Sequence, residues 1–210
     1  MKPFDRISGA AAPLLTDDIN TDQIAPASRN FKPDYAELLF SRWRRTTEGV
    51  EIADFVLNRA PFREAQILVA RENFGSGSSR ESAVWALLAF GIRVVVARSF
   101  ADIFRENCLK NGLLPITLDA GDRAAFEANV VADDGASPCT VDLIAQTVTG
   151  PGPSAYHFTI DPAERDALLR GLDDIGLTLE ALDAITDWET RMTTKRPWLQ
   201  RIPNGTAVWR

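Results

Sequence analysis

The chain has 210 residues, of which 45% are hydrophobic, and carries a formal net charge of −6. Such a length and apolar content are enough to bury the core of a globular domain. The acidic balance excludes a general nucleic-acid-binding protein, because such a protein needs a basic face to displace counterions from the phosphates.

No apolar run reaches the ~18 residues that a membrane span requires, and the start of the chain lacks the hydrophobic stretch of a signal peptide. We therefore expect no membrane partner and a cytoplasmic protein. Two cysteines, Cys108 and Cys139, and a single histidine are too few for a disulfide framework or a four-ligand metal centre. Any metal that the reaction of this protein needs is expected to come from elsewhere.

The first two-thirds of the chain contain the clearest elements. Residues 10–14 form an apolar stretch, and a polar turn follows over residues 16–23. Buried strands are predicted over residues 66–70, 92–97 and 114–118, and helices between them over 79–90 and 100–111. Apolar strands that alternate with helices indicate a parallel βαβαβ unit covered on both faces, with ligand sites at the carboxyl ends of the strands.

Local signals mark the ends of both helices. The second helix has an apolar stripe, formed by Phe100, Ile103, Phe104 and Cys108. Gly112 is placed to end this helix. Each helix also begins with a capping-box pattern, Ser78 with Glu81 and Ser99 with Asp102. On this interpretation Ser78 is only a helix cap, worth ~1 kcal/mol of stability.

Beyond residue 133 the pattern changes. Residues 133–153 are rich in Gly, Pro, Asp and Ser around the alternating segment 139–148, which predicts short antiparallel strands. Residues 162–195 have a helical periodicity that is interrupted at Gly176. Since no linker is long enough to divide the chain, we expect one domain over residues 1–210, with its core over about 5–160 and a helical tail over about 161–195.

The turn before the first helix is the most informative stretch. Residues 75–80 read Gly-Ser-Gly-Ser-Ser-Arg. At the start of a helix, free backbone N–H groups, hydroxyls and a guanidinium can converge on one small anion. The surrounding residues, 71–110, include six basic and four acidic side chains, although charges spread along helices are also common on plain solvated surfaces. The turn therefore points to carboxylate chemistry.

Other uses of a glycine-rich turn fit less well. A Rossmann fingerprint needs a third glycine where this chain has Arg80, and a P-loop needs a lysine that the turn lacks. A serine hydrolase needs a different turn and a histidine base. The sole histidine, His157, lies in a strand-like segment and is interpreted as an ordinary strand residue.

Residues 75–81 match the pattern G-x-G-S-S-R-E, and in this the chain resembles the swivel domain of the aconitase superfamily. Three further landmarks lie in the order of that family. Residues 20–24, followed by Pro26, resemble its T-D-x-I turn, and residues 98–104 and 111–115 resemble its next helix and strand. Because the chain stands alone and ends in a helical tail, it is similar in particular to the small subunits of 3-isopropylmalate dehydratases, over about residues 5–190.

The resemblance implies an α/β fold, the aconitase-type swivelling domain, with a parallel βαβαβ core, additional short strands and a helical C-terminal tail. It also implies the small subunit of a hydro-lyase that isomerises 2-isopropylmalate and 3-isopropylmalate by dehydration and rehydration, in leucine biosynthesis. Such enzymes use a [4Fe-4S] cluster, which needs three or four thiolates. Since this chain has two cysteines, the cluster is expected on a separate large subunit, and the chain is expected to be active only in that hetero-oligomer.

The family pattern assigns roles to individual residues. Ser78 corresponds to the general base, which removes a proton from the carbon next to a carboxylate and needs nearby donors to stabilise its alkoxide. Ser79 and Arg80 correspond to residues that bind a substrate carboxylate, the arginine through a two-pronged contact. Asp22 corresponds to a residue that orients the basic groups of the site.

The chain departs from the family at three places. Ser76 lies between the two glycines, where a cysteine is often found, and is expected to matter little to the mechanism. Ser82 stands where a histidine is usual, and the loop after Pro26 differs from the usual versions of a segment that helps to select the substrate. In this loop Arg29 is the candidate for a second carboxylate clamp, with Lys32 or a merely solvated cation as alternatives. The unusual loop leaves open another substrate, a homoaconitate-type acid or a methyl-substituted malate. A non-catalytic anion-binding module of the same fold is a third hypothesis.

Overall fold

The computed structural model describes residues 1–28, 30, 33–77 and 80–200, and the chain divides into two compact units, residues 1–171 and 172–210. The expectation of a single domain stays a prediction. The strands of the described part are β1 Arg6–Gly9, β2 Ala11–Leu14, β3 Ile67–Ala70, β4 Val94–Val96, β5 Leu114–Ile116, β6 Cys139–Asp142, β7 Thr147–Thr149 and β8 Ala155–His157. Its α-helices are α1 Thr21–Ile24, α2 Tyr35–Leu38, α3 Ser41–Arg44, α4 Glu81–Phe90, α5 Asp102–Asn111, α6 Ala120–Asp133, α7 Pro162–Arg170, α8 Asp174–Leu179 and α9 Leu182–Lys195, and short 3₁₀ turns are η1 Val56–Asn58, η2 Phe62–Glu64 and η3 Pro197–Gln200.

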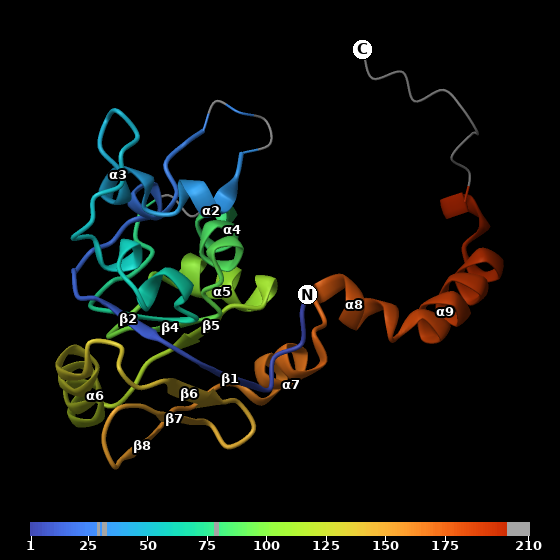
Figure 1. Ribbon diagram of the computed structural model, residues 1–210. Helices are drawn as coiled ribbons and strands as arrows, with labels where there is room; N and C mark the ends of the chain where they lie inside the picture. The colour runs from blue at the N-terminus through green and yellow to red at the C-terminus, as the bar shows by residue number, and fades with distance from the viewer. Residues whose placement is uncertain (29, 31–32, 78–79, 201–210) are drawn as a thin grey trace. The chain divides into compact units, whose positions relative to one another are not determined.

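A parallel sheet with the strand order β2-β3-β4-β5 lies at the centre of the first unit (Figure 1). Its register places one row of paired residues across all four strands, Ala11, Ile67, Val94 and Leu114. These short strands are apolar and buried apart from two partly exposed prolines, as expected of a parallel sheet covered on both faces. Because α4 connects β3 to β4 and α5 connects β4 to β5, the predicted βαβαβ unit is confirmed.

The second sheet is antiparallel, with the order β1-β6-β7-β8. Strands β6 and β7 are the short antiparallel strands predicted around residues 139–148. His157 ends β8, where it is exposed and pairs with Thr147. Its interpretation as an ordinary strand residue is confirmed.

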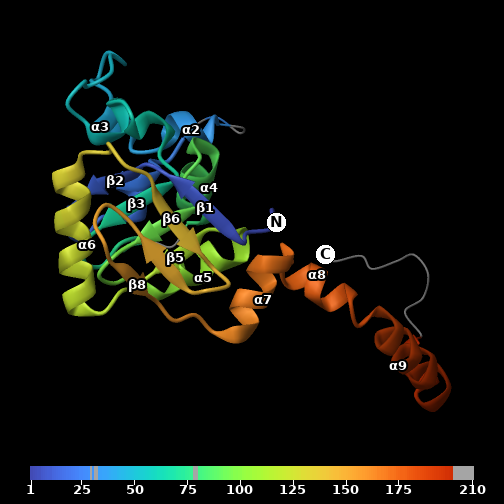
Figure 2. The ribbon, with the colours of Figure 1, turned by 60° about the horizontal axis from the view of Figure 1, so that its bottom comes forward.

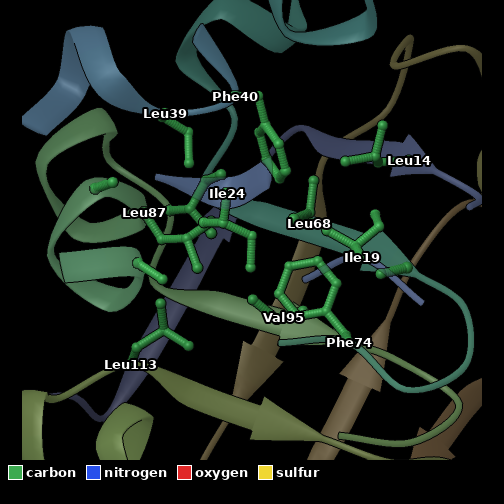
Figure 3. Close-up of a cluster of buried hydrophobic side chains, with 14 of the residues drawn as sticks. Leu14, Ile19, Ile24, Leu39, Phe40, Leu68, Phe74, Leu87, Val95 and Leu113 are labelled. Carbon is green, nitrogen blue, oxygen red and sulfur yellow. The ribbon is translucent and has the colours of Figure 1, made fainter. Parts of the chain in front are cut away.

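One hydrophobic cluster lies between the parallel sheet and α4 (Figure 3). Leu68 and Val95 of the sheet pack with Leu87 of α4, and all three are fully buried. Phe74, from the turn after β3, belongs to the same cluster. Since a buried side chain of this size contributes ~1.5–3 kcal/mol, the cluster fixes the start of α4 as well as its length.

A second cluster fills the opposite side of the parallel sheet, against the antiparallel sheet and α6. Val69 of β3 and Val141 of β6 meet Phe126 of α6 there. The Phe126 ring packs edge-on against that of Tyr156, with centroids 5.5 Å apart, and the Asn129 side-chain amide donates to the Tyr156 hydroxyl at 3.0 Å. Figure 2 shows α6 beside the two sheets, which completes the cover of the second face.

Two expectations about α5 are wrong. Ile103 is 55% exposed, so the buried stripe of this helix consists of Phe104 and Cys108. The predicted capping box is absent, because Ala101 occupies the N-cap position and the Ser99 hydroxyl instead accepts a hydrogen bond from the Asn73 N–H at 2.8 Å. The expected glycine stop is confirmed, since Gly112 ends the helix with a φ of +82°.

The second unit contains α8 and α9, and the predicted interruption at Gly176 is wrong. Gly176 lies inside α8, where its N–H donates to the Asp173 side chain at 2.7 Å in the first turn. A glycine whose N–H is used by a cap does not need to end a helix. The breaks fall instead at Gly171, which closes α7 with a φ of +71°, and at Glu180 and Ala181 between α8 and α9.

Both cysteines are buried and free, Cys108 in the first cluster and Cys139 in the second. Burial raises the pKa of both thiols, that of Cys139 to about 12. Because the thiolate is the reactive form, we expect neither cysteine to react with iodoacetamide in the native protein at mildly alkaline pH. Both should react in urea. Mass spectrometry after alkylation measures this, and rapid modification of the native chain would contradict the packing.

Candidate active site

Three segments meet at the carboxyl edge of the parallel sheet, residues 15–24 after β2, 71–77 after β3 and 97–101 after β4. The middle segment is bonded through its backbone to both neighbours. The Asp18 N–H donates to the Glu72 carbonyl at 2.9 Å, and the Phe74 N–H donates to the Ser99 carbonyl at 3.0 Å. The Ala101 N–H returns a bond to the Phe74 carbonyl at 3.0 Å. The three loops are therefore hydrogen-bonded to one another in the same order as the strands that they follow.

The turn itself is fixed against the first segment. The N–H groups of Gly75 and Ser76 both donate to the Ile19 carbonyl, at 2.7 and 3.2 Å. The Thr21 N–H donates to the Ser76 carbonyl at 2.9 Å. These bonds hold residues 75–77 beside the start of α1.

Gly75 is required at its position for two reasons. Its φ of +81° lies in the left-handed region, and a Cβ built on it would lie 2.1 Å from Cγ of the Phe104 ring. Backbone and ring can approach this closely only without a side chain. Gly77 also has a positive φ, +87°, but an added Cβ there would meet only Asn20, at 3.5 Å.

Asp22 and Arg80 form an ion pair across the site. Asp22 is presented by α1, whose first turn is fixed by a reciprocal capping box. In this box the Gln23 N–H donates to the Asn20 side chain at 2.9 Å, and the Asn20 N–H donates to the Gln23 side chain at 2.7 Å. The side chains of Asp22 and Arg80 are 61% and 35% exposed, so the pair is worth only ~0–1 kcal/mol.

Arg80 precedes α4 and has an extended backbone at the N-cap position, with no side-chain cap. The predicted cap at Ser78 is therefore wrong, because the helix begins at Glu81. Ser78 and Ser79 lie outside the described residues, as do the loop cations Arg29 and Lys32. Of the predicted site residues, the structure brings Asp22 and Arg80 together.

The positive charge counted over residues 71–110 is largely offset by carboxylates from later parts of the chain. Arg98 forms a two-pronged bond to Glu127 of α6, at 3.1 and 3.0 Å, and Glu127 raises the pKa of Arg98. Arg105 forms a similar bond to Glu164 of α7, at 3.2 and 2.9 Å. These two arginines therefore connect elements of the fold. Their charge does not by itself indicate a binding site, in line with the alternative that charges along helices are common on plain surfaces.

Sequence reasoning missed the side chains that support the turn. The Asn73 amide donates to the Asp18 carboxylate at 2.7 Å, and the Asn73 N–H donates to the Ser99 hydroxyl. Asn73 has a φ of +55°. An asparagine in the turn between a predicted strand and a predicted helix is a signal for such a left-handed position, although it does not reveal the partners.

A buried arginine anchors the segment that follows the loop at residues 25–34. Arg44 is 6% exposed, and its guanidinium lies 4.9 Å from the ring centroid of Phe90 at the end of α4. It donates to the Asn58 side chain and to the Ala36 carbonyl of α2, both at 3.1 Å. Burial lowers the pKa of Arg44. Through this residue α2 is tied to the end of the helix that begins at the site.

Within the described ranges, no group of three or more His, Cys, Asp or Glu side chains is arranged to hold a metal ion. Among the helices of those ranges, none is long and apolar enough to cross a membrane. The cytoplasmic location expected from the sequence stays a prediction.

Comparison with known proteins identifies the family. The profile of the aconitase C-terminal domain matches residues 1–121, and that of the C-terminal domain of the 3-isopropylmalate dehydratase small subunit matches residues 174–202. The 3-isopropylmalate dehydratase small subunits of Paramagnetospirillum magneticum and Dinoroseobacter shibae are 46% identical over 204 residues and 45% identical over 206 residues. Each match extends over 95% of this chain and 100% of the relative. The chain belongs to the family of 3-isopropylmalate dehydratase small subunits.

A solved structure of the same family has the same fold. The crystal structure of 3-isopropylmalate dehydratase from Methanocaldococcus jannaschii matches with a TM-score of 0.62 and 28% identity, over 87% of this chain and 99% of that chain. The aconitase-type α/β fold implied by the sequence is confirmed. In this small subunit residues 75–77, the described start of the glycine-serine turn, thus lie where the loops of a parallel sheet converge.

Replacement of Gly75 by alanine tests how tightly this turn is packed. The left-handed backbone costs ~1–2 kcal/mol for alanine, and the clash with Phe104 adds ~1–3 kcal/mol of overpacking. We expect Gly75→Ala to lower the free energy of unfolding by about 2–5 kcal/mol in urea titrations. Gly49→Ala is the matched control, because Gly49 has a φ of +83° and no atom within 4 Å of an added Cβ. Equal losses in the two variants would contradict the close approach.

Proposed function

We propose that this chain is the small subunit of a two-subunit 3-isopropylmalate dehydratase. The enzyme is a hydro-lyase that isomerises 2-isopropylmalate and 3-isopropylmalate by dehydration and rehydration, in leucine biosynthesis. The observation that carries the proposal is the full-length similarity to proteins named as this subunit, which includes both the aconitase-like part and the C-terminal domain typical of the small subunits. The partner is the large subunit of the same enzyme.

The resemblance implies a [4Fe-4S] cluster, and the cysteines of this chain do not fit one. Cys108 and Cys139 belong to separate hydrophobic clusters on opposite faces of the parallel sheet, and burial raises the pKa of both thiols. Ligation needs several thiolates around one centre. We therefore assign the cluster to the large subunit.

Ser78 is proposed as the general base that removes a proton from the carbon next to a substrate carboxylate. A serine hydroxyl is too weak an acid for this unless its alkoxide is stabilised. In the sequence Ser78 lies two residues before the N-cap of α4, a helix of ten residues whose first N–H groups and dipole favour negative charge. The cation of Arg80 is close along the chain.

Arg80 is proposed to bind a substrate carboxylate, with Ser79 beside it. Its present partner, Asp22, is largely exposed, so the pair is weak enough to be replaced. Among the described residues, Nε of Arg80 is buried and has no hydrogen-bond partner. A guanidinium with an unsatisfied buried donor and an exchangeable anion suits a two-pronged carboxylate contact. Asp22 then serves to hold Arg80 in place between turnovers, and Arg29 remains the proposed second clamp, with Lys32 as the alternative.

Substitution of Ser78 tests the proposed base in the enzyme reconstituted from both subunits. We expect Ser78→Ala to lower kcat by about 10²–10⁴, the usual effect of losing a general base, while the variant still binds the large subunit. Ser76→Ala, in the same turn, is the matched control and should retain most of the activity. The chain alone should show neither iron absorbance nor dehydratase activity. Wild-type rates for Ser78→Ala would exclude Ser78 as the base and favour a non-catalytic module.

Substitution of Arg80 by lysine tests the carboxylate contact. One point charge replaces a two-pronged donor, so KM for 3-isopropylmalate should rise by about tenfold, with a smaller change in kcat. Arg63→Lys is the control, because Arg63 makes an exposed two-pronged bond to Glu51 elsewhere in the fold. Steady-state kinetics of both variants measure the difference. Unchanged kinetics for Arg80→Lys would remove Arg80 from the site.

A further inference from the structure

Three polar side chains form a connected group on the surface between α4 and α5. The Trp85 indole N–H donates to the Asn111 side-chain oxygen at 3.0 Å. The Asn111 side-chain N–H₂ donates to the Glu81 carboxylate at 3.2 Å and to the Asn107 carbonyl at 2.9 Å. Glu81 and Trp85 lie one turn apart on α4, and Asn111 is the last residue of α5. The group therefore joins the first turn of α4 to the end of α5.

The chemistry of these groups fixes the orientation of the Asn111 amide. An indole N–H can only donate, so the amide oxygen must face Trp85. The N–H₂ group then faces Glu81 and the Asn107 carbonyl, which both accept. Every bond in the group has a donor opposite an acceptor, and the reverse orientation of the amide would lose all three bonds.

Trp85 is held in turn by α2. The ring of Tyr35, the first residue of α2, packs edge-on against the indole, with centroids 5.4 Å apart. The group therefore connects α2 to the helix that begins at the proposed carboxylate site.

The position of Glu81 gives this group a role. Glu81 directly follows Arg80, and a free carboxylate so close along the chain is a competitor for the guanidinium. In the structure Arg80 pairs with Asp22, while the Glu81 carboxylate accepts from Asn111. The two neighbouring charges are thus held in different contacts.

We propose that Asn111 is a positioning residue that holds the Glu81 carboxylate away from Arg80, so that a carboxylate of the substrate has to displace Asp22 and not Glu81 as well. The proposal rests on the carboxylate-binding role proposed for Arg80. Asn111 does not touch the substrate, and it acts through Glu81 alone.

The test combines two substitutions in the complex reconstituted with the large subunit. Asn111→Leu keeps a side chain of similar size but removes every bond of the amide. It should raise KM for 3-isopropylmalate by about three- to fivefold, the upper range for an exposed charge pair, with kcat within about twofold. The same substitution made together with Glu81→Gln should leave KM as it is in Glu81→Gln alone, because the competing charge is gone. This rescue separates positioning from a structural role.

Two further variants serve as controls. Trp85→Phe keeps a ring for Tyr35 but loses the indole N–H, so it should raise KM in the same direction and by less, while thermal unfolding reports whether the fold is intact. Glu106→Gln removes an exposed carboxylate elsewhere on α5 and should leave KM unchanged.

The outcomes are distinct. A KM increase that persists in the Glu81→Gln background, or no increase in any Asn111 or Trp85 variant while Arg80→Lys still raises KM, overturns the role of Asn111 and leaves the proposed function standing. Unchanged kinetics for Arg80→Lys overturns the role of Arg80, and the role of Asn111 with it.

Discussion

The backbone pairing of residues 71–77 with the loops on both sides is the constraint on which the candidate site depends. Parallel strands end at one edge of their sheet, and the polar backbone groups that emerge there need partners. In this protein the loops supply them to one another, through bonds such as those from Gly75 to Ile19 and from Phe74 to Ser99. The conformation of the turn is therefore set by the sheet, and the start of α4 follows from it.

The hydrogen-bonded backbone of residues 71–77 contrasts with the weak ion pair of Asp22 and Arg80. A buried ion pair between Asp22 and Arg80 would be hard to separate, because each charge would lose its partner in a medium of low dielectric constant. The observed pair is exposed, so water compensates either charge when the other leaves. A hydrogen-bonded main chain beside an ion pair whose carboxylate can be exchanged suits an enzyme that must bind and release an anion in each turnover.

The sequence was sufficient for the parts of the fold that local patterns determine. Three apolar strands alternating with two helices specified the parallel unit, and Gly112 marked the end of α5. The errors arose where a group expected to start or end a helix was used by another hydrogen bond, with a distant residue in one case and a near one in the other. Ser99 could have capped α5, but its hydroxyl is used by Asn73, which lies in another loop. Gly176 could have ended a helix, but Asp173 uses its N–H.

Contacts between distant segments could not be predicted from one sequence. The anchoring of α2 by Arg44 joins residues that carry no mutual signal in the chain. For Asp22 and Arg80 the family pattern implied a common site, but not that the two side chains pair. The periodicity of α5 likewise placed Ile103 on the buried side, although only the packing of neighbouring elements decides which apolar residue faces solvent. For Ser78 as the proposed general base, the family pattern remains the basis of the assignment.

The burial of both thiols affects how oxidants damage such an enzyme. Exposed iron–sulfur clusters are damaged by oxidants, whereas a thiol sealed in a hydrocarbon interior and kept protonated offers them little to attack. With the cluster on the large subunit, as proposed above, oxidants are expected to inactivate the enzyme through that subunit while the cysteines of this chain stay reduced.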